Sequence, residues 1–368
     1  MKSISDKFWW RGLIAGLGAA LAGGGNTAEH SPHSSPAPTE RDAFVWQADE
    51  ALGLEGRGWT DTASLFDRLP ARAKERVRPP VWGLSHCSAG MAVRFTTDAS
   101  VLRVRWTLTR RSLALPHMAA TGVSGVDLYV RDATGRLRFC RNGRPTAVTN
   151  EVTFPLPGGR EYVLYLPLYN GVKHLALGVP AGKKLVSLPP RPLSEAIVFY
   201  GTSITQGGCA SRPGTAFPAW VGRALDRPVI NLGFSGNGKM EPELADLLAE
   251  LNPAVYVLDC LPNMTVEMVS ERVEPFVRRL RAAHPDTPIL LAEDPNVRDT
   301  PTPKGKVLRR IYARLKAGGD AHLYFLPNTH MLGEDQEGTV DGTHPTDLGM
   351  AREAAVFTRC LRPILACP

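Results

Sequence analysis

The sequence changes its hydrophobic pattern at a cluster of prolines, Pro189-Pro190-Arg191-Pro192, which divides the chain into two unlike halves. Stacked prolines cannot continue a β-ladder, so any preceding sheet ends there. Before this cluster, short segments alternate apolar with polar residues and are separated by Gly, Pro and Asn. These segments are Met91–Thr96, Val101–Leu108, Gly125–Val130, Leu137–Cys140, Tyr162–Leu166 and His174–Gly178. Many short strands without helical stretches predict an antiparallel β-sandwich or jelly roll.

After the prolines, short apolar runs alternate with longer segments of helical periodicity. Strands are predicted over 197–200, 229–232, 255–258, 288–291 and 323–326, and helices over 217–225, 241–251, 266–283, 304–316 and 347–361. This alternation predicts an α/β domain with a parallel sheet covered by helices on both faces. Functional groups of such folds gather at the carboxyl ends of the strands.

The first 22 residues have the pattern of a signal peptide. Lys2, Lys7 and Arg11 precede a short apolar stretch that ends in Ala20-Leu21-Ala22, an A-x-A-like cleavage site. The stretch is too short and too rich in glycine to span a bilayer. Residues 23–42 are rich in Gly, Ser, Pro and Thr and are typical of a linker. We therefore expect an exported protein, periplasmic or extracellular, the alternative being a disordered leader.

Length and composition fit two globular domains. The 368 residues, 43% hydrophobic and 21% charged, suffice for a β-sandwich domain over 43–190 and an α/β domain over 191–368. The net charge of +7 comes from scattered arginines, without a basic block interleaved with aromatic residues. We therefore expect no nucleic-acid partner and no stable membrane insertion. The sequence does not indicate an oligomeric state.

The six cysteines are too few for a disulfide scaffold. None forms a CxxC motif, and no His/Cys cluster has the spacing of zinc ligands, so we expect neither a metal nor a cofactor. Cys209 and Cys260 follow the first and third strands of the second half. A disulfide between them is one option, and buried free thiols are the other. Cys209 is not expected to be a nucleophile, because no histidine or basic residue stands beside it in the sequence.

Ser203 and a distant Asp/His pair contain the parts of an activated serine. Ser203 follows the apolar run Ala196–Tyr200 on a tight turn, and Asp341 stands three residues before His344. A serine hydroxyl needs a base to take its proton, and the base needs a carboxylate to orient it. Alone, each motif is more often a turn, a helix cap or a surface histidine.

Four segments together resemble the signature blocks of SGNH (GDSL-type) hydrolases, in the same order. They are Tyr200-Gly-Thr-Ser-Ile-Thr-Gln206, Asn231-Leu-Gly-Phe-Ser-Gly236, Leu258-Asp-Cys-Leu-Pro-Asn263 and Asp341-Gly-Thr-His344. Upstream, Gly125-Val-Asp-Leu-Tyr129 is similar to the GxDLY motif of a β-sandwich domain that precedes some members. The resemblance covers about residues 195–365 and implies a flavodoxin-like SGNH hydrolase domain behind a GxDLY-type sandwich.

The resemblance implies that Ser203 is the nucleophile, His344 its base and Asp341 the orienting carboxylate. It assigns the oxyanion donors to the backbone N–H groups of Ser203 and Gly236 and to the side-chain amide of Asn263. Glycine suits position 236 because a Cβ would crowd the substrate. The alternative role of Asn263 is to cap the helix predicted over 266–283, which Thr265 could do instead.

This sequence departs from the family in two places. The first block has Gly-Thr-Ser in place of Gly-Asp-Ser, and Leu261 stands where a glycine is usual in the third block. Two further candidates could line the site. Glu293-Asp294 is more typical of a cap or turn, and His117 would have to reach across the domain interface.

The resemblance implies a secreted serine esterase that removes acetyl or similar small acyl groups, with an acylated carbohydrate or another small ester as substrate. One alternative is a lipid or thioester acylhydrolase, but no exposed apolar helix or lid-like segment supports it. Another alternative is an inactive glycan-binding protein. The complete Ser/Asp/His set argues against that reading.

Overall fold

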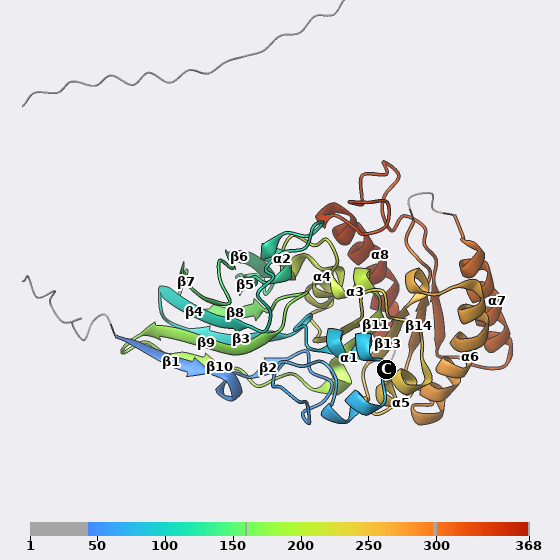
Figure 1. Ribbon diagram of the computed structural model, residues 1–368, viewed down its shortest axis with the longest axis horizontal. Helices are drawn as coiled ribbons and strands as arrows, with labels where there is room; N and C mark the ends of the chain where they lie inside the picture. Colours follow the sequence, from blue (N-terminus) through green and yellow to red (C-terminus); the bar gives the residue numbers. More distant parts are fainter. Residues whose placement is uncertain (1–42, 159, 297–299, 367–368) are drawn as a thin grey trace, which may run out of the picture. The chain divides into compact units, whose positions relative to one another are not determined.

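The computed structural model describes residues 43–158, 160–296 and 300–366. The predicted signal peptide and linker lie outside these described residues. Two antiparallel sheets come first along the chain, and a parallel sheet flanked by helices follows (Figure 1). Within the described ranges, no helix is long and apolar enough to cross a membrane.

The first two sheets form the predicted antiparallel sandwich. One sheet has the order β1-β9-β4-β7, from β1 (Phe44–Ala48), β4 (Val101–Leu108), β7 (Thr149–Pro155) and β9 (Val172–Pro180). The other has the order β10-β3-β8-β5-β6, from β3 (Ala92–Thr97), β5 (Val126–Arg131), β6 (Leu137–Gly143), β8 (Arg160–Tyr165) and β10 (Leu185–Ser187), with β2 (Leu54–Glu55) paired to β3. Strand β4 shows why they pack face to face. Its residues Leu102, Val104 and Trp106 are fully buried in the core shared with the second sheet, while Arg103 and Arg105 between them are not.

One segment of the first half contributes to the cores of both domains, with Phe66 in the sandwich core. The 3₁₀-helix η3 (Ala71–Glu75) and helix α1 (Pro79–Ser85) occur where the sequence predicts no helix, and that expectation was wrong. Helix α1 begins with two prolines, whose missing N–H groups cost nothing in a first turn. The apolar side chains of Trp59, Leu69 and Val81 join the core of the second domain. Residues 59–81 therefore help to complete the α/β domain.

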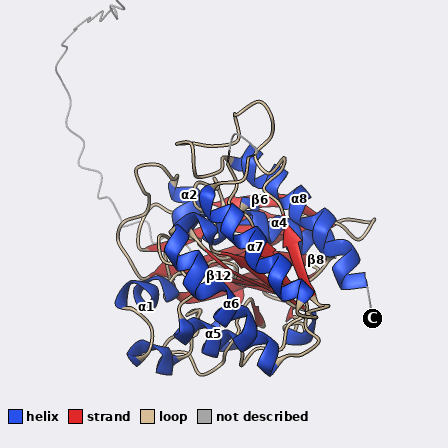
Figure 2. Cartoon of the chain, turned by 90° about the vertical axis from the view of Figure 1, so that its right-hand side faces the viewer, coloured by secondary structure: helices blue, strands red, loops and turns tan. Residues whose placement is uncertain are grey.

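The parallel sheet has the flavodoxin-like order β12-β11-β13-β14-β15, as the resemblance implies. Its strands are β11 (Ile197–Gly201), β12 (Val229–Gly233), β13 (Val255–Asp259), β14 (Ile289–Ala292) and β15 (Leu323–Leu326). The helices are α3 (Ser203–Gln206), α4 (Phe217–Leu225), α5 (Pro242–Leu248), α6 (Val266–Ala283), α7 (Pro303–Ala317) and α8 (Asp347–Ala366). Figure 2 shows strands between α4 and α8 on one side and α5 and α6 on the other.

Central strand β11 is buried on both faces, as its continuous apolar run predicts. Val198 and Tyr200 face the cluster formed with α5, α6 and α7. Ile197 and Phe199 face α4 and α8, where Phe199, Phe217 and Phe357 pack ring against ring. Helices on both faces leave the strand ends as the exposed route to the sheet.

The GxDLY-like strand is where the sandwich joins the loop after α3. Asp127 of β5 is fully buried and accepts hydrogen bonds from Arg212 Nη1 (2.6 Å) and the backbone N–H of Gly214 (3.0 Å). Tyr129 accepts a second bond from Arg212 Nη1, at 2.8 Å, and the Arg223 guanidinium lies 4.2 Å from the centre of its ring. Burial raises the pKa of Asp127 against the opposing effect of Arg212. This motif is thus an interface between the two domains.

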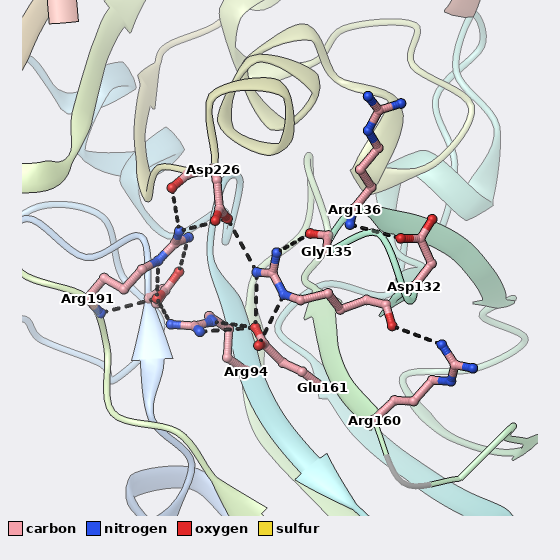
Figure 3. A network of polar contacts seen from close by, with 10 residues as sticks. Arg94, Asp132, Gly135, Arg136, Arg160, Glu161, Arg191 and Asp226 are labelled. Carbon is pink, nitrogen blue, oxygen red and sulfur yellow. Dashed lines mark hydrogen bonds and ion pairs between the residues drawn. The ribbon is translucent and has the colours of Figure 1, made fainter. Parts of the chain in front are cut away.

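A network of ion pairs forms a second junction between the domains (Figure 3). The carboxylates of Glu55, Glu161 and Asp226 bind the guanidinium groups of Arg94, Arg131 and Arg191, with each carboxylate paired to two arginines. The cavity beside them has a volume of only about 30 Å³, room for about one water molecule. In this network three carboxylates pair with three guanidinium groups from both domains, so it links the sandwich to the α/β domain.

Candidate active site

Ser203 lies where the resemblance implies, at the first position of α3, directly after β11. Thr202 caps α3: its side chain accepts a bond from the backbone N–H of Ile204 (3.3 Å), while its own N–H bonds Thr205 Oγ1 (3.0 Å). The residue before Thr202, at position 201, must be glycine. A Cβ on Gly201 would lie 2.0 Å from Thr205 Oγ1. The sharp turn from strand to helix therefore fixes Ser203 at the carboxyl edge of the sheet.

His344 and Asp341 come together on the loop that precedes α8. Ser203 Oγ lies 2.9 Å from His344 Nε2, and His344 Nδ1 lies 2.8 Å from Asp341 Oδ2. The other carboxylate oxygen of Asp341 accepts backbone N–H bonds from Thr343 (3.0 Å) and His344 (2.8 Å). The structure thus joins the three predicted residues in one hydrogen-bonded chain.

The charge on Asp341 defines the proton positions in this chain. Burial alone would raise the pKa of Asp341, but the backbone and side-chain hydrogen bonds from His344 lower it to about 2. An ionised carboxylate can only accept a hydrogen bond, so Nδ1 of His344 carries a proton. Nε2 of the neutral ring then presents its lone pair to the Ser203 hydroxyl. This tautomer is the one that a base for Ser203 requires.

The three residues assigned to the oxyanion site follow three neighbouring strands. β11 lies between β12 and β13, with Gly201 opposite Gly233 on one side and Asp259 on the other. Ser203, Gly236 and Asn263 therefore follow strand ends at the same edge of the sheet. Gly236 has a φ of +69°, and a Cβ there would meet no protein atom within 4 Å. Its left-handed backbone, on a face that the protein leaves open, accounts for the glycine.

Asn263 is held through its side-chain oxygen. Gly238 N–H donates to Asn263 Oδ1 at 3.3 Å, which leaves Nδ2 as the donor still available. The alternative capping role falls to another residue, because Thr265 accepts the hydrogen bond from Met268 N that caps α6. Although Leu261 replaces the usual glycine, residues Leu261–Asn263 form a regular 3₁₀ turn, η6.

The sandwich domain also contacts the Ser203 turn, through side chains to which the sequence assigned no role in the site. Tyr169 donates its hydroxyl to the backbone carbonyl of Ser203 at 3.0 Å. Gln206 of α3, fully buried, donates to the carbonyl of Leu168 (3.0 Å) and accepts from the N–H of Ser235 (3.1 Å). Gln206 thereby couples α3 to both the sandwich and the Gly236 loop. The sequence feature that could have pointed to Gln206 is its position in the first signature block.

His117 does reach across the domain interface. Its ring centre lies 5.6 Å from that of His344. The loop that carries it is held by fully buried Asn170, whose side chain bonds the backbone of Arg110 and Ser112. The buried side chain of Met118, next in sequence, packs in the core of the second domain. An exposed imidazole of the sandwich is thus fixed beside the Ser203 site.

Two other expectations from the sequence concern the cysteines Cys209 and Cys260 and the acidic pair Glu293-Asp294. Cys209 and Cys260 are both free, so the disulfide considered between them is wrong. Burial, followed by the charge of Asp341, raises the pKa of Cys209 to about 11, which keeps it a poor nucleophile although His117 and His344 lie nearby. Glu293 and Asp294 are structural: Glu293 pairs with Arg309 at 2.5 Å, and Asp294 accepts a bond from Thr302 at 3.0 Å.

A pair of buried carboxyl groups lies behind the Ser203 turn. Asp259, at the end of β13, accepts a 2.6 Å hydrogen bond from Thr205 of α3. Burial raises its pKa to about 7. Fully buried Glu353 of α8 has its pKa raised well above the ordinary value, first by burial and then by the charge of Asp259. Neither oxygen of Glu353 has a hydrogen-bond partner among the described residues.

The arrangement suits attack of a serine oxygen on an acyl carbon. It contains a hydroxyl, a correctly oriented base and N–H groups around one strand edge, which are the elements of acyl transfer. Ser203, Gly236 and Asn263 each follow the end of a different strand, and the base comes from the loop before α8.

Comparisons with known proteins identify the family of each half of the chain. Residues 194–362 match the GDSL-like Lipase/Acylhydrolase family, and residues 44–185 match the N-terminus of Esterase_SGNH_hydro-type, GxDLY. The chain is similar to the structure of a GDSL-like lipase candidate from Bacteroides ovatus, with 34% identity over 88% of this chain and 98% of the other, and a TM-score of 0.81. No curated protein matched the chain.

Two more distant structures share the fold. Salicylyl-acyltransferase SsfX3 from a tetracycline biosynthetic pathway is 21% identical over 90% of this chain and 99% of the other, with a TM-score of 0.72. A family two carbohydrate esterase from Cellvibrio japonicus is 15% identical over 88% of this chain and 98% of the other, with a TM-score of 0.59.

Proposed function

Since the chain belongs to the GDSL-like lipase/acylhydrolase family and carries the GxDLY-type N-terminal domain, we propose that it is an exported serine esterase that removes acetyl or similar small acyl groups from carbohydrate. The observation that carries the proposal is the hydrogen-bonded chain from Ser203 Oγ through His344 to Asp341, at 2.9 and 2.8 Å. The carbohydrate part is supported by the likeness in fold to the family two carbohydrate esterase.

In the proposed reaction, Ser203 Oγ attacks the acyl carbon while its proton passes to His344 Nε2. Asp341 stabilises the imidazolium that forms, and the oxyanion accepts hydrogen bonds from the N–H groups of Ser203 and Gly236 and from Asn263 Nδ2. His344 then gives the proton to the leaving alkoxide. A water molecule, deprotonated by His344, hydrolyses the acyl-enzyme and restores Ser203.

The test of the reaction class uses a serine-directed fluorophosphonate and a 4-nitrophenyl acetate assay. The probe should label Ser203 and abolish activity, and the Ser203→Ala protein should be neither labelled nor active. Ser270→Ala, at an exposed position on α6, is the matched control and should behave as the wild type. Label on a different serine, or an active Ser203→Ala protein, would overturn the proposal.

The substrate class is tested separately. Rates on 4-nitrophenyl esters of increasing chain length should be highest for acetate, and acetate should be released from at least one of a panel of acetylated polysaccharides. A preference for long acyl chains, with no release of acetate from any glycan, would favour a lipid acylhydrolase instead.

A further inference from the structure

Three side chains able to bind a metal ion meet beside Ser203, although they stand far apart in the sequence. They are His117, on the sandwich loop between β4 and α2 (Ala120–Val123), Cys209, after α3, and His344. One ligand atom from each lies within 4.8 Å of the ligand atoms of the other two. Sequence spacing could not reveal this group, because its members come from both domains and from two separate loops of the second.

The first member is exposed, and the second is a buried thiol that forms no disulfide. The ring nitrogens of His117 make no hydrogen bond within the described part of the chain, and the side chain is exposed. Cys209 is a free thiol whose left-handed backbone, φ +72°, places it in the turn after α3. A metal ion binds the thiolate, so binding would release the thiol proton to solvent.

The third member is already oriented as a metal ligand would be. Imidazoles bound to metals commonly donate their other ring N–H to a carboxylate, which fixes the tautomer. Nδ1 of His344 makes that bond with Asp341, at 2.8 Å. The nitrogen left for a metal is therefore Nε2, the atom that also faces Ser203 Oγ at 2.9 Å.

We propose that His117, Cys209 and His344 form a binding site for a zinc-like divalent ion, and that the bound ion inhibits the enzyme by taking Nε2 of His344 away from Ser203. Two imidazoles and a thiolate are the ligands that Zn²⁺ and Co²⁺ prefer, whereas Mg²⁺ and Ca²⁺ require oxygen ligands. Three protein ligands leave the fourth tetrahedral position for water or for the Ser203 hydroxyl. The inhibition rests on the proposed function, but the binding site does not.

Binding is tested without any activity, on the Ser203→Ala protein titrated with Co²⁺. One ion per chain should bind and produce a thiolate-to-cobalt charge-transfer band, which Zn²⁺ should displace. The band should be lost in Ser203→Ala/Cys209→Ser. In Ser203→Ala/His117→Gln the affinity should fall at least about 10- to 100-fold, as it does even when an outer-shell partner is removed. A protein that gives no such band, or a band that persists without Cys209, would overturn the site.

Inhibition is tested with Zn²⁺ on the active enzyme, each variant being compared with its own metal-free rate. Zn²⁺ should inhibit reversibly, with activity restored by EDTA, and Mg²⁺ should have no effect. Cys209→Ser and His117→Gln should each require at least about 10-fold more Zn²⁺. Cys140→Ser on β6 and His322→Ala before β15, distant in sequence and fold, should retain the wild-type sensitivity. Unchanged sensitivity in Cys209→Ser would overturn the inhibitory role. Co²⁺ bound through Cys209 by a protein without esterase activity would support the metal site and contradict the proposed function.

Discussion

The hydroxyl of Tyr169 donates a 3.0 Å hydrogen bond to the backbone carbonyl of Ser203, so a residue of the N-terminal sandwich holds the turn of the proposed nucleophile. The same carbonyl accepts the N–H groups of Gly207 (3.1 Å) and Gly208 (2.7 Å), which close α3. Ser203 is therefore fixed by its own helix and by the other domain. The sandwich contributes to the geometry of the site even before any substrate contact is considered.

Tyr169→Phe should lower kcat about 2- to 10-fold with little change in KM, because one neutral hydrogen bond is worth about 0.5–1.5 kcal/mol. The two N–H donors that remain keep the turn in place. Steady-state kinetics on 4-nitrophenyl acetate provide the measurement. The matched control is Tyr312→Phe, on α7, whose hydroxyl makes no hydrogen bond to the rest of the described chain. Equal kcat in both variants would contradict a positioning role for Tyr169.

Asp341 should not determine the acid limit of activity. Its hydrogen bonds to His344 outweigh burial and hold its pKa at about 2, below the ordinary 3.8, so the carboxylate stays ionised well below pH 4. The fall of kcat/KM toward acid should therefore report another group, the base that accepts the Ser203 proton. Asp341→Asn should lower kcat by on the order of 10⁴-fold, since the amide favours the wrong tautomer. A pH-rate profile with an acid limb near pH 2 would contradict this assignment.

The lowered pKa of Asp341 also makes the stability of the folded protein depend on pH. The native state holds the Asp341 proton more weakly than the unfolded chain does, so this contribution is present above about pH 4 and is lost as the pH falls toward about 2. Denaturant unfolding of wild type and Asp341→Asn should show an advantage for the wild type at pH 5 that shrinks by pH 3. A difference in unfolding free energy between the two proteins that is the same at both pH values would contradict this role of Asp341.

The buried pair Asp259 and Glu353 should have the opposite effect. The pKa of each is raised in the folded state, that of Asp259 from 3.8 to about 7, so the folded protein keeps protons that the unfolded chain has released. The contribution of the pair to the free energy of unfolding is therefore greatest below about pH 4 and declines as the pH rises to about 7.

Glu353→Gln tests this pair, because glutamine keeps the shape of a protonated glutamate and stays uncharged at every pH. At pH 8 the free energy of unfolding of the variant should be higher than that of the wild type, because the amide needs no bound proton to stay uncharged in the buried site. Near pH 4 the difference should vanish. Glu337→Gln, at an exposed position, should match the wild type at both pH values. A Glu353→Gln protein that is less stable at pH 8 would contradict the account.

Asp127→Asn should destabilise the protein by about 3 kcal/mol, the lower end of the range for breaking a buried ion pair. The lower end applies because Arg212 keeps 23% of its side chain exposed and can recover some hydration. Urea unfolding provides the measurement, and kcat should fall as well, because the loop from Gly207 to Ala216 loses an anchor. Glu151→Gln, in the exposed pair with Arg105 on the same domain, is the control and should unfold as the wild type does. Similar stability of the two variants would contradict the role of the GxDLY-like strand as an interface.

The elements that follow from local periodicity could be predicted from the sequence. Helices α4 and α6 occur over 217–225 and 266–283 as predicted, and the five parallel strands lie within one residue of their expected ends. Each of these elements is encoded by apolar residues that repeat at its own period, a pattern that needs no knowledge of the rest of the chain. The strand-end positions of Ser203, Gly236 and Asn263 follow from the same pattern and from the rule that ligands bind at the carboxyl ends of parallel strands.

Other features depended on which distant segments pack together. Local pattern could not reveal that Trp59 and Val81 complete the core of the second domain, that Asp259 and Glu353 share one buried environment, or that Cys209 lies near His117 rather than in a disulfide. The aspartate of the GxDLY-like motif was visible, but its partner Arg212 was not. Periodicity specifies which face of an element is buried. What covers that face is decided only when strand order, loop paths and domain contacts are set by packing of the whole chain.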